Sequence, residues 1–198
     1  MNRIDTAEFK ALMNLVDPYV YRHRLTMPKY IINATGDSLF LPDSSRFYYD
    51  GLEGPKLLQY VPNSDHNVDE TNSVLSYFHA ISTGVTLPEM SWTTDDTGTL
   101  HVVSNRVPKA ANLWQASNAN ARDFRVGTIG ETWIKSPLEI QPDGGCSVQV
   151  TKPDKGWKAY FVEMVFDLGA PVPLLTTTSV TIMPDVYPDG SALNDSKL

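Results

Sequence analysis

Asp37 and His66 are the two residues of this sequence whose types and positions suit acid–base chemistry carried out together. Asp37 follows the apolar run Pro28 to Thr35, and His66 comes shortly after a second apolar run, Lys56 to Val61. An imidazole acts as a general base when a carboxylate fixes its tautomer at one ring nitrogen and the other nitrogen accepts a proton from a nucleophile. The two residues therefore predict the acid and the base of a hydrolytic Ser-Asp-His triad.

The two apolar runs have the length and composition of β-strands. The residues between them predict a short crossover helix with a polar start and an apolar face, formed by Pro42, Ser44, Ser45, Phe47, Tyr48 and Tyr49. A right-handed crossover between parallel strands brings the carboxyl ends of both strands to one edge of the sheet. Open α/β sheets bind their ligands at that edge. A βαβ unit would thus place Asp37 and His66 within hydrogen-bond reach.

Two other carboxylates compete with Asp37 for the role of the acid. Asp43 follows Pro42 and has the position of a residue that begins a helix. Asp65 precedes His66 directly, but adjacent side chains on a turn usually diverge. Asp37 itself lies in a Gly-Asp-Ser sequence that makes a good turn without any catalytic role. The sequence favours Asp37 because His66 lies at the matching end of the next strand.

A long segment resembles one protein family. The segment DPYVYRHRLTMPKYIINATGDSLFLPDSSRFYYDGLEGPKLLQYVPNSDHNVD is similar to the PhoPQ-activated pathogenicity-related proteins, and the likeness continues through LWQASNANARDFR, GETW and GWKAYFVEMVF. GD after one strand and PNSDH after the next resemble the acid and base of an α/β-hydrolase, in which the chain order is Ser, Asp, His. The resemblance implies a virulence-associated serine hydrolase for esters or amides, with Asp37 and His66 as its catalytic residues.

The same resemblance implies a nucleophile that this sequence lacks. Proteins of the family carry a long N-terminal part with most of the sheet and the nucleophilic serine, and nothing in this sequence reads G-x-S-x-G. We therefore expect the chain alone to be inactive, and to need an N-terminal hydrolase segment or a homo-oligomer to complete the site. The substrate that the resemblance implies is a small ester, peptide or glycan. A secreted or periplasmic parent protein is compatible with the resemblance.

The composition excludes several classes of partner. A net charge of −7 and the lack of Lys/Arg clusters argue against binding to nucleic acid. No apolar run is long enough to span a membrane, and the N-terminus shows no export signal. A single cysteine, Cys146, allows no intramolecular disulfide and is interpreted as a structural thiol. We predict neither a cofactor nor a metal site.

The predicted fold class is α/β plus all-β. Residues 1–84 are expected to form the C-terminal part of an α/β-hydrolase-like domain with a βαβα order, including helices at Thr6 to Val16 and Asp69 to Thr83. Gly84 ends the second helix, and Val85 to Pro88 form a linker. Residues 89–186 read as short strands separated by turns, which is typical of an immunoglobulin-like or fibronectin III-like β-sandwich. Residues 187–198 form a flexible tail.

An alternative function needs no catalysis. In that hypothesis the chain is a truncated protein whose β-sandwich binds a protein or a glycan. The tryptophans of the second half allow two interpretations, as core residues or as an exposed aromatic strip for a sugar: Trp92, Trp114, Trp133 and Trp157. The core interpretation is favoured because large aromatic side chains are usually buried.

Overall fold

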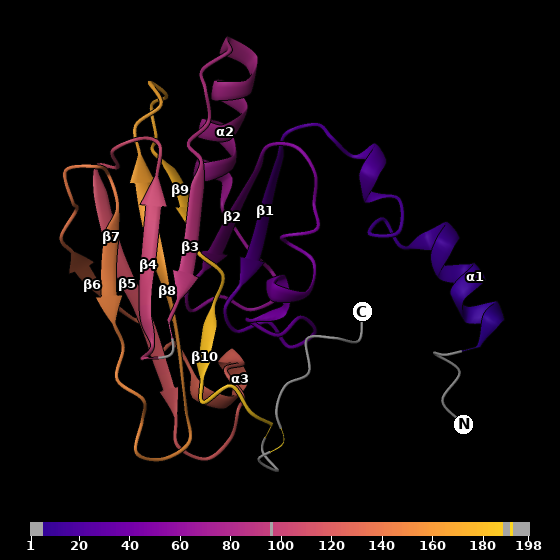
Figure 1. Ribbon diagram of the computed structural model, residues 1–198, viewed down its shortest axis with the longest axis vertical. Coiled ribbons are helices and arrows are strands. Elements are labelled where there is room, and N and C mark those ends of the chain that lie inside the picture. Colours follow the sequence, from indigo (N-terminus) through magenta and orange to yellow (C-terminus); the bar gives the residue numbers. More distant parts are fainter. Residues whose placement is uncertain (1–5, 96, 188–190, 192–198) are drawn as a thin grey trace.

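The computed structural model describes residues 6–95, 97–187 and 191. Figure 1 shows a mostly β molecule with a helical arm at one side. The helices of the described part are α1 (Ala7–Val16), α2 (Thr71–Thr83), α3 (Val126–Ile129) and the 3-10 helices η1 (Arg22–Arg24) and η2 (Ser44–Phe47). Its strands are β1 (Lys29–Ala34), β2 (Lys56–Val61), β3 (Met90–Thr94), β4 (Thr99–Ser104), β5 (Ala110–Asn118), β6 (Ile134–Leu138), β7 (Cys146–Gln149), β8 (Trp157–Phe166), β9 (Leu174–Thr177) and β10 (Thr181–Met183).

Helix α1 stands apart from the rest of the molecule (Figure 1). It begins where the Thr6 side chain accepts a hydrogen bond from the amide of Phe9, and it ends at Asp17 because Pro18 follows. None of its residues is buried, and Leu15 is 79% exposed. The helix therefore contributes no residue to either apolar cluster of the core.

Strands β1 and β2 form a parallel two-stranded sheet in which Ala34 lies opposite Val61. The other edge of β2 is covered by two threonines of β9. Thr177 Oγ1 accepts from the amide of Tyr60 at 3.0 Å, and Thr176 Oγ1 donates to the carbonyl of Leu58 at 2.9 Å. These hydroxyls satisfy buried backbone groups of β2 that no neighbouring strand pairs.

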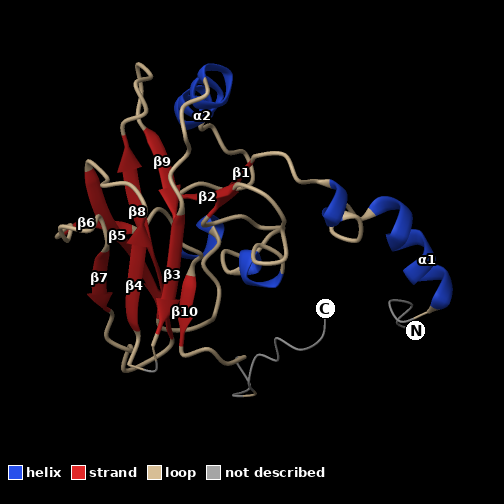
Figure 2. Ribbon diagram, turned by 45° about the horizontal axis from the view of Figure 1, so that its top comes forward, coloured by secondary structure: helices blue, strands red, loops and turns tan. Residues whose placement is uncertain are grey.

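Two antiparallel sheets make up the larger part of the molecule, and Figure 2 shows them as the red strands β3 to β10. One contains β3, β4 and β7 in that order, and the other contains β10, β8, β5 and β6, with β9 also paired to β8. Alternate residues of β8 face opposite sides of its sheet. Val162 and Met164 pack in one apolar cluster with Leu100 and Val102 of β4, whereas Phe161 packs in a second cluster with residues of β2. The central strand β8 thus holds both layers together.

The predicted α/β-hydrolase fragment with its βαβα order is wrong. Strands outweigh helices, and the crossover between β1 and β2 contains the four-residue 3-10 helix η2 in place of an α-helix. The crossover sequence explains the difference, because Pro42, Gly51, Gly54 and Pro55 confine any helix to a few residues. The two facing sheets after residue 89 fit a β-sandwich, but they have their own strand order.

The domain boundary at 84–89 stays a prediction. The predicted tail at 187–198 falls outside the described residues except for Tyr187 and Ser191. No helix in the described part of the chain is long and apolar enough to cross a membrane.

Candidate functional site

The parallel pairing of β1 and β2 continues into the turns that follow the two strands. The amide of Thr35 donates to the carbonyl of Val61 at 3.0 Å, and the amide of Gly36 donates to the carbonyl of Ser64 at 2.9 Å. In the reverse direction, the amide of Asn63 donates to Thr35 Oγ1 at 3.1 Å. These three hydrogen bonds fix the turn before Asp37 against the turn before His66.

The structure places Asp37 and His66 in direct contact, which confirms the predicted proximity. His66 Nδ1 lies 2.9 Å from Asp37 Oδ2. The other carboxylate oxygen, Oδ1, accepts from the amides of Leu39 at 2.7 Å and Phe40 at 3.2 Å. The centroid of the Phe40 ring lies 5.9 Å from the centroid of the imidazole. Asp37 is therefore held at both oxygens, and one of them is directed at the histidine.

The carboxyl group of Asp37 is buried, whereas the imidazole of His66 is about half exposed. Burial of Asp37 on its own would raise the pKa of its carboxyl, but hydrogen bonds from Leu39, His66 and Phe40 outweigh it and lower the pKa below its ordinary value. The carboxylate is therefore charged at neutral pH and stabilises the fold there, and that contribution is lost as pH falls through its lowered folded-state pKa. The His66 side chain is 49% exposed, and Nε2 has no hydrogen-bond partner within the described residues. A carboxylate at Nδ1 and an accessible Nε2 are what a general base requires.

Gly36 is needed for a close approach beside this site. Its carbonyl accepts from the amide of Val126, the first residue of α3, at 3.1 Å. A Cβ at position 36 would lie 2.4 Å from Val126 Cγ2, 2.9 Å from Val126 N and 3.0 Å from the carbonyl oxygen of Ser64. Two of these three atoms belong to the backbone and cannot rotate away.

We expect Gly36→Ala to lower the free energy of unfolding by about 2 kcal/mol, because overpacking forces the backbone at α3 and the turn before His66 to shift. Urea denaturation measures this cost. Gly127→Ala is the matched control, since a Cβ there meets nothing within 4 Å. Equal costs for the two substitutions would contradict the proposed close approach.

The competing acids are placed elsewhere. Asp43 is buried, and its carboxylate forms an ion pair with the guanidinium of Arg122 at 2.5 Å. Asp65 is exposed and accepts from the amide of Asn67 at 3.0 Å. Neither is hydrogen-bonded to His66, so Asp37 is the carboxylate that the structure pairs with the imidazole.

Asn63 is a site residue that the sequence interpretation missed. Its backbone has a positive φ of 56°, and its side chain exchanges two hydrogen bonds with the backbone of Trp133, at 2.9 and 3.1 Å. Asparagine tolerates this left-handed conformation better than most residues do. The Pro62-Asn63 pair after β2 is typical of a turn, so the sequence could have indicated the turn itself. Nothing near Asn63 in the sequence identifies Trp133 as its partner.

The four tryptophans do not form an exposed strip. Trp133 is 4% exposed, and Trp92 stacks on Tyr49 with ring centroids 5.6 Å apart. The indole N–H of Trp114 donates to Glu163, and that of Trp157 donates to a backbone carbonyl. The core interpretation of these side chains agrees with this arrangement.

The remaining candidates for chemistry are few. Cys146 is a buried free thiol, and burial raises its pKa to about 11. A thiol held protonated in this way is a poor nucleophile. The described residues contain no group of three or more His, Cys, Asp or Glu side chains that could hold a metal ion.

Two comparisons with known proteins found sequences similar to this chain. The family model described as PhoPQ-activated pathogenicity-related protein matches residues 1–125, a range that includes both Asp37 and His66. A relative from Dictyostelium discoideum, named autocrine proliferation repressor protein A, is 28% identical over 221 residues. That alignment covers 96% of this chain and 45% of the relative, so the chain spans about half the length of the relative.

Proposed function

The chain belongs to the PhoPQ-activated pathogenicity-related family, and from this membership we propose that Asp37 and His66 supply the acid and base of a site that hydrolyses an ester or amide bond. The observation that carries the proposal is the 2.9 Å contact between His66 Nδ1 and the buried carboxylate of Asp37. This contact holds the imidazole in the tautomer with a proton on Nδ1. Nε2 then has a free lone pair.

The reaction follows from that tautomer. A nucleophilic hydroxyl transfers its proton to Nε2 as its oxygen attacks the substrate carbonyl, and the imidazolium that forms is stabilised by the Asp37 carboxylate. The same proton then passes to the leaving alcohol or amine when the tetrahedral intermediate collapses to an acyl-enzyme. Water then attacks the acyl-enzyme and gives a proton to Nε2. The carboxylic acid is released as the nucleophile regains that proton.

The nucleophile of this proposal comes from polypeptide outside residues 1–198, because no G-x-S-x-G sequence is present in the chain. The greater length of the Dictyostelium relative supports this part of the proposal.

The test uses the chain itself. We expect no labelling by a fluorophosphonate probe and no ester turnover above a His66→Ala control. Nitrogen NMR should nevertheless detect His66 with its proton on Nδ1, and Asp37→Asn should abolish this fixed tautomer because the amide no longer requires a donor at that nitrogen. Probe labelling of a serine in this chain, abolished by His66→Ala, would show that the nucleophile is present after all. An Nε2-protonated His66 would refute the acid–base assignment.

A surface for the missing polypeptide, or for a second copy of the chain, is suggested by β1 and α2. Strand β1 pairs only with β2 within the described residues, so its other edge carries peptide groups without a strand partner. Helix α2 exposes an apolar stripe of Val74, Leu75, Phe78 and Ile81, of which Phe78 is 67% exposed. Exposed apolar surface next to a free strand edge favours association.

We therefore expect the isolated chain to self-associate at micromolar concentration, as measured by sedimentation. The double substitution Leu75→Lys and Phe78→Lys should shift it to the monomer, because it places charges in the apolar stripe. Lysine at the exposed position Asn72 of the same helix is the control and should leave the association unchanged. A monomeric wild-type chain that unfolds cooperatively would rule out this surface.

A second function is suggested by the name of the relative. We infer as a second proposal that this chain acts by binding a partner without catalysis, because the name of the relative states an effect on proliferation and no reaction. The His66→Ala chain separates the two proposals. It should retain any effect on proliferation if binding is sufficient, and lose that effect if hydrolysis is required.

A further inference from the structure

A long groove runs beside strand β3, away from the Asp37 and His66 pair. Three consecutive cavities of about 470, 400 and 300 Å³ are lined by successive parts of β3 and its following turn. The first two share Tyr49, Asp50 and Trp92, and the last two share Thr94 with residues of β10. Strand β10 lies close to the carboxyl end of β3 in both ribbon views (Figure 1 and Figure 2), and residues of the two strands line the same cavity. The three cavities therefore lie next to one another along the strand.

The edge of β3 that faces this groove has unpaired peptide groups. The strand pairs only with β4 in the described part of the chain. The ladder hydrogen bonds at its two ends join Asp95 N to Thr99 O at 3.0 Å and Asn105 N to Glu89 O at 3.2 Å. Because the direction of peptide groups alternates along an antiparallel strand, Trp92 and Thr94 direct their N–H and C=O groups away from β4.

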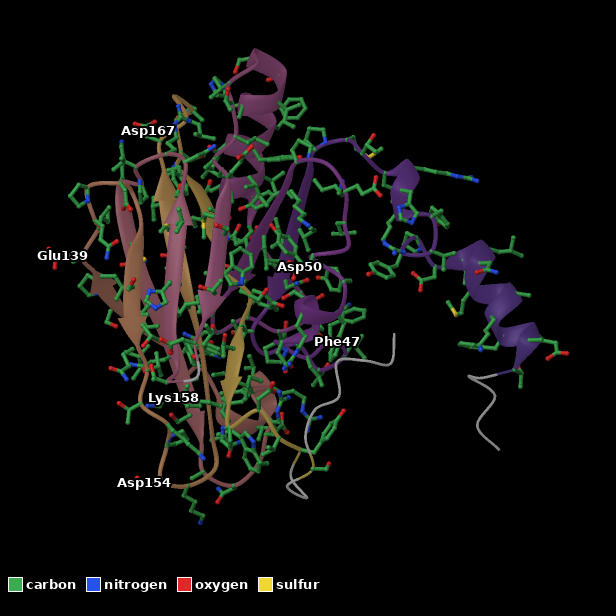
Figure 3. The ribbon with its side chains drawn as sticks, viewed as in Figure 1. Phe47, Asp50, Glu139, Asp154, Lys158 and Asp167 are labelled. Carbon is green, nitrogen blue, oxygen red and sulfur yellow. The ribbon has the colours of Figure 1, made fainter. Side chains whose placement is uncertain are left out.

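The cationic side chains of the groove have hydrogen-bond partners, whereas two of its carboxylates form no direct ion pair within the part of the chain that the structure describes. Lys56 Nζ donates to three backbone carbonyls, those of Tyr49, Asp50 and Leu52, at 2.8 to 3.0 Å. Arg46 binds both carboxylate oxygens of Asp185 at 2.8 Å. The carboxylates of Asp50 and Glu89 are exposed at one end of the groove, and neither forms a direct ion pair among the described residues, although the Lys56 ammonium attracts Asp50 at longer range. Asp50, labelled in Figure 3, comes from the segment between η2 and β2.

We propose that this groove binds an extended peptide that adds a strand to the free edge of β3 and places a lysine or arginine side chain between Asp50 and Glu89. Outward peptide groups on alternate residues recur about every 6.6 Å, which matches the repeat of an incoming strand. A sugar would have less to bind, because Tyr49 and Trp92 stack on each other and occupy one another's faces. This inference is independent of the proposed hydrolysis.

The test is an NMR titration of the isotope-labelled chain with a capped hexapeptide of alternating threonine and valine. Two versions of the peptide are used, one with a single lysine at its amino end and one with a single lysine at its carboxyl end. The two control peptides carry glutamate at the same positions. We expect the lysine peptide to shift the backbone amide signals of Trp92 and Thr94 and to bind about fivefold more tightly than the glutamate peptide. The double variant Asp50→Asn and Glu89→Gln should remove that preference.

Two variants at one position test strand addition itself. Thr94→Pro removes an outward N–H without breaking the ladder to β4, and proline is tolerated in an edge strand whose N–H faces solvent. It should weaken binding about tenfold, whereas Thr94→Val keeps the amide and should bind as the wild type does. The proposal is overturned if both variants bind the peptide equally well, or if the glutamate peptide binds as tightly as the lysine peptide. It is also overturned if millimolar lysine peptide leaves the amide signals of Trp92 and Thr94 unshifted while cellohexaose shifts the Trp92 indole signal.

Discussion

Replacing His66 by alanine is expected to lower hydrolytic turnover by about a millionfold in a polypeptide that carries both this chain and the nucleophile. Without the imidazole, no group accepts the proton of the attacking hydroxyl, and the leaving group departs without a proton. Asp37→Asn should cost about ten-thousandfold, because an amide cannot hold the imidazole in the tautomer that exposes a basic Nε2. Ester turnover by a longer product of the gene, or by a fusion with the unmatched part of the relative, measures both effects.

The control for these two variants is Asp65→Asn. Asp65 is adjacent to His66 in sequence, but it accepts a hydrogen bond from its own turn. Its substitution should change turnover by less than about threefold, because an exposed charge outside the proton-transfer path contributes little. A loss at Asp65 equal to that at Asp37 would reverse the assignment of the acid.

Replacing Glu163 by leucine is expected to lower the free energy of unfolding by about 3 kcal/mol. The side chain of Glu163 is 7% exposed and accepts from Asn112 Nδ2 at 3.0 Å and from the Trp114 indole N–H at 3.1 Å. Leucine fills a similar volume but leaves both donors without an acceptor. Urea denaturation at neutral pH measures the cost.

Lys135 provides the comparison for this prediction. Its ammonium lies 2.9 Å from Glu163, but its side chain is 46% exposed and can return to water. Lys135→Met should therefore cost less than about 1 kcal/mol. If it destabilises the chain as much as Glu163→Leu does, then the ion pair rather than the two buried donors accounts for the stability.

The proximity of Asp37 and His66 was predictable because it depends on local information. Each residue follows an apolar run that forms a strand, and parallel pairing brings the ends of both strands together whatever lies between them. The crossover was predicted incorrectly because spacing alone does not separate an α-helix from a single 3-10 turn. In this segment Pro42 and the glycines after Tyr49 decided the outcome.

Other features depend on partners far away in the sequence. Asp43 reads as the start of a helix, but its charge is paired with Arg122, which no local pattern connects to it. The threonines at Thr176 and Thr177 read as ordinary strand residues, whereas their hydroxyls satisfy the backbone of β2. Such contacts require the tertiary structure, because they join residues that are 79 to 118 positions apart in the sequence.

The isolation of α1 has a consequence for its amide hydrogens. A helix shorter than about 12 residues is marginal in water without tertiary contacts, and α1 has 10 residues, none of them buried. Its amides should exchange with solvent at nearly the rate of an unstructured peptide, while those of β8 exchange only when the whole sheet opens. Slow exchange in α1 would accordingly report that another surface has covered Leu12 and Leu15.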